Sequence, residues 1–289
     1  MENQSGAVRV MLGGRSYSGS QFNRAVSNNR LPGSSFKPFV YLTAMELSGY
    51  NPSSIVKDEP IAIEILGTKL WEPKNFGDKY FGDTILKKAM MKSLNSVSVK
   101  LIQEVTPENV IKIARKFGVT SMLGNNLSLA LGTSGVSPLE MASAYSTIAN
   151  LGVYNEPYFI ERIEDFKGNP LYEHFYHGAQ VYAPKSIYPL LNMMQGVVDD
   201  GTGRIVRQMG FKHPAGGKTG TTNSFKDSWF NGFTKTFSTS VWVGYDNNEP
   251  MIEESGKGLT GASAAAPIWT LYMEKALQGK NQINFSIPA

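Results

Sequence analysis

A serine and a lysine three positions apart could form a nucleophile and its base, and Ser34 and Lys37 have that spacing. They lie in the stretch LPGSSFKPFVYLTAME, where Pro38 directly follows the lysine. A proline fits the first turn of a helix, because its missing N–H has no partner there, but it costs about 3 kcal/mol in a helix interior. The sequence therefore predicts a helix that begins close to Ser34, with the Lys37 amine one turn on and within reach of the Ser34 hydroxyl.

The Ser-x-x-Lys spacing by itself is a weak signal, because a chain of this length contains it about once by chance. A second match, Ser54 to Lys57, occurs in the stretch NPSSIVKDE. That stretch is rich in Pro and Ser and no apolar helix follows it, so the pattern predicts a loop without chemistry. Ser34 alone combines a helix start with a lysine one turn on.

Two further polar clusters could complete a site around Ser34. The residues Ser-Leu-Asn at 93–95 interrupt an apolar stretch, and the run KTGTT at 218–222 lies in a segment rich in β-branched residues. A lysine accepts a serine proton only when its own pKa is lowered toward 7 or 8, which burial and a neighbouring cation can achieve. Lys218 is a candidate for that cation.

Composition excludes several other kinds of site. The 289 residues contain no Cys, so thiol chemistry and Cys-ligated metals are excluded. Two of the three His, His174 and His177, are three residues apart, but no carboxylate recurs at metal-ligand spacing, and a solvated loop is expected there. Without a suitable His, a serine nucleophile needs lysine as its base. The net charge of +4 is spread along the chain and favours no nucleic acid partner.

The elements that must position these clusters can be predicted from periodicity. Apolar residues at helical spacing in 84–103 predict two helices that meet at the polar corner 93–96. Alternating or β-branched residues predict a strand in 6–14 and successive antiparallel strands in 216–247. Further helices are predicted at 106–118, 137–152, 185–203 and 263–279, and a hairpin at 158–174.

Helix boundaries carry their own signals. Thr106 is predicted to cap one helix, while Ser137 with Glu140 forms the capping-box pattern of the next. Pro267 predicts a bend in the last helix. Strands at both ends and helices between them predict an α+β fold: an antiparallel sheet flanked by helices, with a helical subregion at about 36–152 inserted between sheet segments.

Together the motifs resemble the transpeptidase domain of class A (bifunctional) penicillin-binding proteins, which share their architecture with serine β-lactamases. The resemblance is carried by PGSSFKPFVYLTA, SLNSVSVKL and GKTGTTNSFKDSWFNGFT, with GGRSYSGSQFNRA, GVSPLEMASAYSTIANLG, GTGR and AAAPIW in the family's order. It covers nearly the whole chain and implies a single domain over 1–289. The family's membrane anchor and glycosyltransferase domain have no counterpart here, so a soluble fragment is expected.

The resemblance implies a serine acyltransferase, a D,D-transpeptidase that cross-links peptidoglycan stem peptides. Ser34 would attack the penultimate D-Ala carbonyl, Lys37 would take its proton, and Ser93 would relay a proton to the leaving D-Ala. Asn95 would hold Lys37 and the substrate amide. The helix start at Ser34 and the N–H of Thr221 would form the oxyanion hole.

Substrate binding falls to the KTGTT strand by the same resemblance. The hydroxyls of Thr219 and Thr221, beside the catalytic Lys218, would bind the terminal carboxylate, with Thr222 in the same binding run, and Gly220 would leave room for substrate along the strand. The expected partners are a donor stem peptide ending in D-Ala-D-Ala, an acceptor amine, and β-lactams as covalent inhibitors. No cofactor or metal is expected. The expected location is the extracytoplasmic face of the bacterial membrane, which such a chain contacts only through the family's anchor.

Two alternatives share the architecture. A β-lactamase typically has Asp in the middle of the second motif and a loop Glu that activates water, whereas Leu94 occupies that middle position and no such Glu is identifiable. A non-catalytic β-lactam sensor domain is acylated once and then signals, but such domains resemble a different branch of the family.

Overall fold

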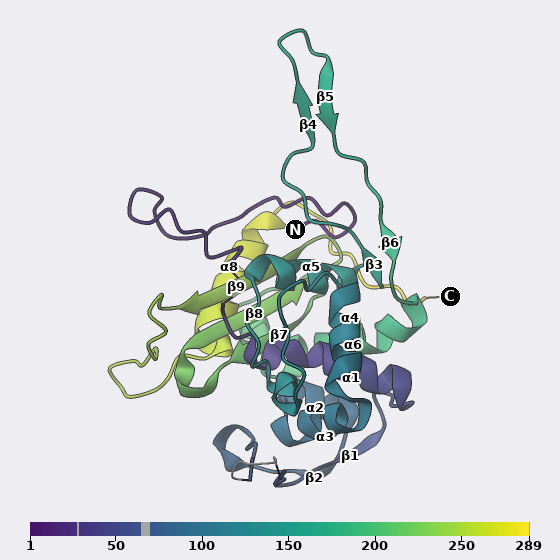
Figure 1. The fold of residues 1–289 in the computed structure, drawn as a ribbon, viewed down its shortest axis with the longest axis vertical. Coiled ribbons are helices and arrows are strands. Elements are labelled where there is room, and N and C mark those ends of the chain that lie inside the picture. The colour runs from purple at the N-terminus through teal and green to yellow at the C-terminus, as the bar shows by residue number, and fades with distance from the viewer. Residues whose placement is uncertain (28, 65–69, 289) are drawn as a thin grey trace.

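A three-stranded antiparallel sheet forms the centre of the molecule (Figure 1). The computed structural model describes residues 1–27, 29–64 and 70–288. The strands β7 (Gly216–Thr221), β8 (Asp227–Phe233) and β9 (Ser238–Gly244) lie in the order β7-β8-β9, with Lys218 opposite Asn231. The KTGTT run therefore lies on an edge strand, and the successive antiparallel strands predicted for 216–247 are confirmed.

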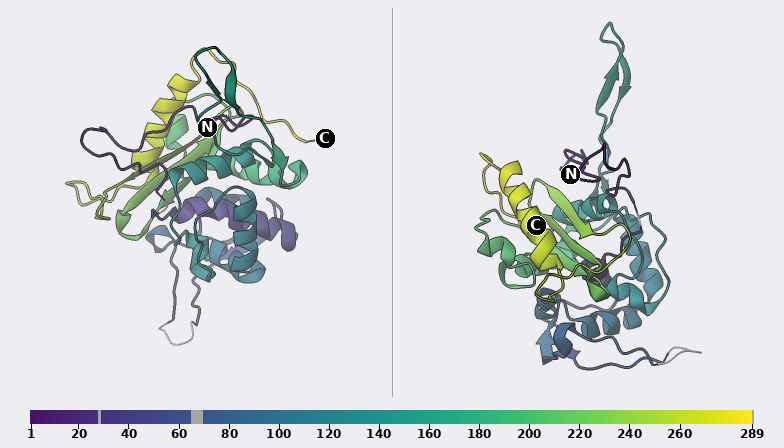
Figure 2. Two further views of the ribbon diagram at one scale, coloured as in Figure 1. Left: turned by 45° about the horizontal axis from the view of Figure 1, so that its top comes forward. Right: turned by 90° about the vertical axis from the view of Figure 1, so that its left-hand side faces the viewer.

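Helices cover both faces of this sheet (Figure 2). On β8, Trp229 and Phe233 point into the larger core, where the Phe233 ring lies 6.5 Å from that of Tyr145 on α5 (Pro138–Ala149). Phe230 points the other way and lies 5.2 Å from Trp269 on α8 (Ala266–Ala276). A strand with apolar side chains on both faces must be covered on both. The α+β prediction is therefore confirmed.

A group of helices lies beside the sheet and carries the first two motifs. They are α1 (Lys37–Leu47), α2 (Leu86–Lys92), α3 (Asn95–Val105), α4 (Pro107–Lys116) and α6 (Pro184–Asp200), whereas the short α7 (Ile205–Gln208) packs with α8 in the smaller core. Short helical turns are η1 (Gly33–Phe36), η2 (Phe76–Asp78), η3 (Leu127–Leu131), η4 (Asn223–Phe225) and η5 (Gly261–Ala265). In the described residues, three small two-stranded antiparallel sheets pair β1 (Ile55–Asp58) with β2 (Gly82–Ile85), β3 (Val153–Tyr154) with β6 (Ala179–Gln180), and β4 (Arg162–Glu164) with β5 (Pro170–Glu173).

Local signals predicted most helix ends correctly. The capping box is present, because Ser137 Oγ accepts from the Glu140 N–H at 3.2 Å and Glu140 Oε2 accepts from the Ser137 N–H at 2.8 Å. Thr106 is the N-cap residue of α4 and Pro107 its first residue, as predicted, although the Thr106 side chain makes no capping hydrogen bond. Thr106 also ends α3, where its φ is 67°, so its backbone conformation is constrained by two helix ends at once. Pro267 lies in the first turn of α8, where the π-helical turn η5 passes directly into that helix.

The strand predicted at 6–14 is missing from the part of the chain that the structure describes. Ala7 makes one isolated bridge, with Tyr158, and the alternating pattern continues without any assigned strand. Val10 is 50% exposed and Leu12 is 80% exposed. The prediction was wrong because an alternating pattern indicates only which side chains share a face, whereas a strand also needs a neighbouring strand to which its backbone can hydrogen-bond.

The hairpin predicted at 158–174 is confirmed as β4 and β5, which project from the body (Figure 1). Among the described residues, no helix is both long and apolar enough to cross a membrane.

Candidate active site

The turn η1 presents one of its two serines. Ser35 is fully buried, and its hydroxyl donates to the Pro32 carbonyl at 2.7 Å while its own carbonyl accepts from the Tyr145 hydroxyl at 2.7 Å. Ser34 is half-buried, and its hydroxyl has no hydrogen-bond partner among the described residues. Helical structure begins at Gly33, as predicted, although its first turn is 3-10 rather than α. Ser34 is therefore the serine whose hydroxyl remains available for chemistry.

Lys37 is the first residue of α1 and is completely buried. Its Nζ donates to the Ser93 carbonyl at 2.7 Å, to Asn95 Oδ1 at 2.6 Å and to Ser93 Oγ at 3.3 Å. These bonds use all three N–H groups of a charged amine, and no hydrogen bond joins Lys37 to Ser34 among the described residues. The predicted contact is thus not made here. A neutral amine donates only two bonds and has a lone pair, so loss of one proton frees the amine to accept from Ser34.

The corner between α2 and α3 brings the second motif to Lys37, as predicted. Ser93 ends α2 with φ 58° and ψ 42°, a left-handed conformation that a residue with a side chain adopts only at some cost. Its carbonyl and hydroxyl both face Lys37 as a result. Lys218 Nζ donates to the same hydroxyl at 2.8 Å and to the Thr219 carbonyl at 3.2 Å. Ser93 Oγ therefore bridges the two buried lysines.

Burial controls the charge of both lysines, which expose 0% of their surface. Burial lowers the pKa of Lys37 well below its ordinary value, and the charge of Lys218 lowers it further, while the charge of Asp58 acts in the opposite direction. Burial lowers the pKa of Lys218 to about 7. Burial thus makes both amines easier to deprotonate, and Lys37 has the Lys218 amine as a neighbouring positive charge.

A buried carboxylate that sequence reasoning missed supports the corner. Asp58 on β1 accepts from the Asn75 side-chain amide at 2.7 Å, from the Phe81 N–H at 2.9 Å and from the Ser96 hydroxyl. Asn75 Oδ1 in turn accepts from the Asn95 N–H at 2.7 Å, at the first residue of α3. The pair supplies a partner for a backbone donor that a helix start leaves unsatisfied. Neither residue lies in a recognisable motif, so no local signal pointed to them.

Asn95 is held at both ends of its side chain. Its Oδ1 accepts from Lys37, and its amide nitrogen donates to the Lys74 carbonyl at 2.7 Å. One N–H of the amide group remains for another acceptor. Asn95 therefore fixes the position of Lys37 and keeps one N–H that can donate to a further group.

The free edge of β7 faces the catalytic turn. Because the Thr222 N–H donates to the Asp227 carbonyl at 3.2 Å, the alternation of an antiparallel strand directs the N–H of Thr221 away from β8. Gly33, with φ 56°, lies against that edge, since an added Cβ would be 2.7 Å from the Thr221 carbonyl oxygen and 3.1 Å from its nitrogen. The N–H of Thr221 and the start of η1, where Ser34 lies, thus converge as an oxyanion hole requires.

The structure indicates why position 220 must be a glycine, and the reason is packing rather than room for substrate. A Cβ at this position would lie 2.2 Å from the Pro32 carbonyl oxygen and 3.1 Å from Ser35 Oγ. The missing side chain therefore allows the catalytic turn to pack directly on β7. A substitution at Gly220 should move Ser34 away from the strand rather than block substrate alone.

Two of the three threonines of the KTGTT run, Thr219 and Thr221, retain capacity to donate a hydroxyl hydrogen bond. Thr219 Oγ1 lies 2.7 Å from Thr202 Oγ1, so one hydroxyl of this pair donates to the other and one proton stays free. Thr221 Oγ1 accepts from the Gly261 N–H at 3.0 Å, which leaves its own proton for another acceptor. Thr202 lies in the stretch GTGR, to which sequence reasoning gave no role.

Thr222 has a structural partner in place of the predicted substrate. Its hydroxyl donates to the Asp227 carboxylate at 3.1 Å and accepts from the Asp227 N–H at 2.9 Å. Both bonds close the turn between β7 and β8. We therefore leave Thr222 out of the substrate-binding group.

The rejected candidates have ordinary roles. Ser54 Oγ accepts from the Asn51 N–H at 2.9 Å, while Lys57 forms an exposed ion pair with Glu59 at 2.9 Å. His174 stacks on the Tyr158 ring, with centroids 3.7 Å apart. None of these side chains contributes to the group around Ser34.

Comparison with known proteins gives consistent matches. The profile of the family described as penicillin binding protein transpeptidase domain matches residues 1–270. Penicillin-binding protein 1A of Aquifex aeolicus is 37% identical over 99% of this chain and 38% of its own length, and that of Pseudomonas aeruginosa is 35% identical over 97% and 40%. The chain thus spans about two fifths of the length of these curated relatives.

Solved structures agree with the sequence matches. A crystal structure of penicillin-binding protein 1A from Haemophilus influenzae has a TM-score of 0.91 at 31% identity, over 100% of this chain and 48% of that one. The PonA1 protein from Mycobacterium tuberculosis, in complex with penicillin V, has a TM-score of 0.88 at 25% identity, over 100% and 79%.

Proposed function

Since this chain belongs to the penicillin-binding protein transpeptidase family, we propose that it is a serine D,D-transpeptidase that cross-links peptidoglycan stem peptides. The observation that carries the proposal is the group formed by the Ser34 hydroxyl, which has no partner among the described residues, and two buried lysines bridged by Ser93 Oγ. A serine hydroxyl is a weak nucleophile until a neighbouring base takes its proton. Burial supplies that base by lowering the pKa of Lys37.

Acylation begins with attack of Ser34 Oγ on the carbonyl carbon of the penultimate D-Ala. The serine proton moves to the neutral Nζ of Lys37 as the Oγ–C bond forms. The C–N bond to the terminal D-Ala then breaks, and the leaving amine takes a proton from the Ser93 hydroxyl. Lys37 or Lys218, both bonded to that hydroxyl, restores its proton.

The negative charge of the tetrahedral intermediate develops where η1 meets β7. The N–H of Ser34 at the start of the turn and the outward N–H of Thr221 supply two donors. Loss of one such donor typically costs about 3 kcal/mol of transition-state stabilisation. Both donors belong to backbone that Gly33 and Gly220 hold in contact.

The terminal carboxylate of the donor binds beside Lys218. The Thr219–Thr202 pair and Thr221 each keep one hydroxyl proton that can donate to the carboxylate, and the Lys218 amine adds positive charge. Hydrogen bonds to a charged acceptor contribute about 1.5–3 kcal/mol each. The same groups accommodate the carboxylate of a penicillin, which acylates Ser34 as a substrate analogue.

The acyl-enzyme is resolved by the amine of a second stem peptide, which forms the cross-link, or by water, which gives carboxypeptidase activity. Because peptidoglycan lies outside the cytoplasmic membrane, this function places the chain on the extracytoplasmic side.

The test is product analysis with a synthetic stem peptide that ends in D-Ala-D-Ala and an acceptor amine. We expect release of D-Ala together with a donor–acceptor adduct in mass spectra, and neither product from a folded Ser34→Ala variant. Release of D-Ala without any adduct would identify a carboxypeptidase. Rapid multiple turnover of penicillin, without an accumulating adduct, would identify a β-lactamase instead.

A further inference from the structure

Three polar side chains form one row across the central sheet. Lys218 on β7 lies directly opposite Asn231 on β8, and Asn231 lies directly opposite Ser240 on β9. Directly opposite residues of antiparallel strands point to the same face, with their Cβ atoms about 4.5–5.5 Å apart. Trp229 and Phe233, two positions either side of Asn231, share that face and belong to the larger core. The row therefore crosses an otherwise apolar layer and begins at a lysine of the candidate active site.

Every member of the row has hydrogen-bonding capacity that no described residue uses. Asn231 is 0% exposed, and both its Nδ2 and its Oδ1 lack a partner. The buried hydroxyl of Ser240 lacks a partner as well. The charged amine of Lys218 has three N–H groups but donates only two bonds, to Ser93 Oγ and to the Thr219 carbonyl. One N–H donor, an amide with two open ends and a hydroxyl are thus neighbours.

An asparagine in this position indicates that its amide has a function. Buried polar groups of folded proteins are nearly always hydrogen-bonded, either to the protein or to ordered water. An apolar side chain would fill the position of Asn231 without the cost of burying an unpaired amide. No direct bond joins the Asn231 amide to either neighbour in the row, so ordered water is the group that can connect them.

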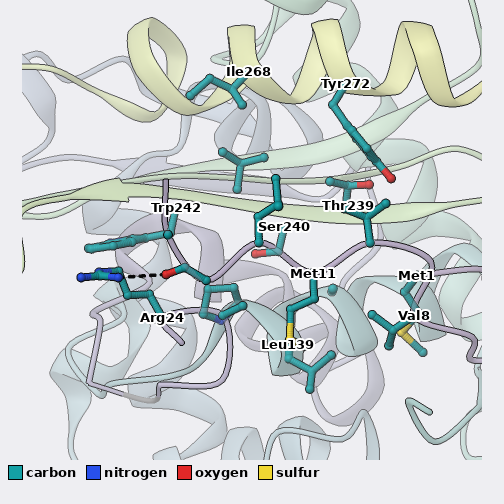
Figure 3. A pocket seen from close by; sticks show the side chains of 18 of the residues that line it. Met1, Val8, Met11, Arg24, Leu139, Thr239, Ser240, Trp242, Ile268 and Tyr272 are labelled. Carbon is teal, nitrogen blue, oxygen red and sulfur yellow. Dashed lines mark hydrogen bonds between the residues drawn. The ribbon is translucent and has the colours of Figure 1, made fainter. Parts of the chain in front are cut away.

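There is room for water at the Ser240 end of the row. Figure 3 shows Ser240 along an open groove of about 460 Å³, with Leu139 of α5 on one side and Tyr272 of α8 on the other. Ala142 of α5, a small residue, also lines this groove. The row thus extends from a completely buried amine at Lys218 to a serine at an open groove.

The charge of Lys218 depends on the partner of its third N–H. Burial lowers the pKa of Lys218 to about 7, because it disfavours the charged amine. A hydrogen-bond acceptor favours the charged amine and opposes that effect. The charged side chains on the elements that hold or pack against the Lys218 strand are Lys37 on α1, Asp227 on β8, and the exposed Lys185, Asp199 and Asp200 on α6. None of these five forms a hydrogen bond with the Lys218 amine in the part of the chain that the structure describes.

We propose that Asn231 is a positioning residue for Lys218, and that one ordered water on each side of its amide completes the row. One water accepts from the third N–H of Lys218 and donates to Asn231 Oδ1, and the other accepts from Asn231 Nδ2 and donates to Ser240 Oγ. A single chain of hydrogen bonds then satisfies all the open groups. Asn231 thereby favours the charged form of Lys218, the cation beside the base Lys37, so its role in catalysis rests on the proposed function.

The test observes Lys218 itself, without any enzymatic assay. The 289-residue chain is labelled with ¹³C at lysine Cε, and NMR spectra follow the Lys218 signal, which Lys218→Met identifies, as the pH is raised. We expect the titration midpoint of Lys218 to fall by about one pH unit in a folded Asn231→Leu variant, because the charged amine loses its partner. Ser240→Ala, at the end of the row, should lower the midpoint by less.

Thr239→Val is the matched control for Ser240→Ala. It also removes a hydroxyl from β9, but on the opposite face of the sheet, where Thr239 Oγ1 donates to Met273 Sδ at 3.1 Å. It should leave the midpoint of Lys218 unchanged. An unchanged midpoint in Asn231→Leu, or an equal shift in Thr239→Val, would overturn the proposal. If Asn231→Leu does not fold, Asn231→Ala removes the same amide with less bulk and is judged by the same criterion.

A second readout separates positioning from a general effect on the sheet. In acylation by a fluorescent penicillin, Asn231→Leu should move the acid limb of the pH profile to higher pH, since Lys37 loses part of the neighbouring charge. The same change made in Lys218→Met should move the limb no further, and an equal shift in both backgrounds would overturn the proposal. Because the NMR titration needs no acylation, a chain that shows the Lys218 shifts without being acylated would contradict the proposed function alone.

Discussion

Replacing Lys218 by Met should move the pH profile of acylation to higher pH. The Nζ atoms of Lys37 and Lys218 both bond to Ser93 Oγ, at 3.3 and 2.8 Å, so they lie within about 6 Å of each other. At an effective dielectric constant of about 20, two unit charges at that distance repel by about 3 kcal/mol, equivalent to about two pK units. Because the pKa of Lys218 is about 7, its charge is partial at neutral pH. Removing it should therefore raise the pKa of Lys37 by about one to two units.

The assay is stopped-flow acylation by a fluorescent penicillin between pH 5 and 10, with folding checked by circular dichroism. The acid limb of the profile reports protonation of the base. As the matched control, Thr219→Val removes a carboxylate-binding hydroxyl without removing charge, so it should lower the rate at every pH and leave the limb in place. A folded Lys218→Met protein whose acid limb stays at the wild-type pH would refute the electrostatic coupling of the two lysines.

Three further outcomes follow from the same geometry. Lys37→Arg should abolish acylation while keeping the charge, because a guanidinium does not accept the serine proton; a wild-type acylation rate would contradict a base role. Asp58→Asn removes a charge that raises the pKa of Lys37, so the acid limb should move to lower pH, opposite to its shift in Lys218→Met. The same change weakens hydrogen bonds to a charged acceptor, so denaturant titrations should show a free energy of unfolding lower by about 2–3 kcal/mol. Burial lowers the pKa of Lys218 from 10.5 to about 7, so the unfolded chain binds more protons than the folded chain between these pH values. The free energy of unfolding should therefore rise with pH across that window. The same rise in Lys218→Met would contradict this.

Rules that act over a few residues predicted the chemical groups of the site. The proline after Lys37 indicated where the turn with Ser34 begins, and the polar interruption at 93–96 indicated the corner between α2 and α3. The β-branched run at 218–222 placed the edge strand. Each of these signals depends only on neighbours in sequence, which is why spacing and residue type were sufficient.

Contacts between distant segments could not be predicted. Asp58 meets Asn75 and Ser96 across 17 and 38 residues, and nothing in the local pattern of any of them indicates a buried network. Gly220 is needed because the Pro32 carbonyl packs on it, a constraint that exists only in the folded chain. The strand expected at 6–14 had the right pattern but lacked a partner, and pairing is a property of two segments.

The most direct test of the catalytic assignment is mass mapping of the penicillin adduct. After incubation with penicillin and proteolysis, the account predicts one modified peptide, with the added mass on Ser34, and no adduct in a folded Ser34→Ala variant. Ser35 is the most informative alternative, because it is adjacent but its hydroxyl is buried and bonded to the Pro32 carbonyl. An adduct on Ser35 or Ser54, or an adduct that persists in Ser34→Ala, would contradict the account.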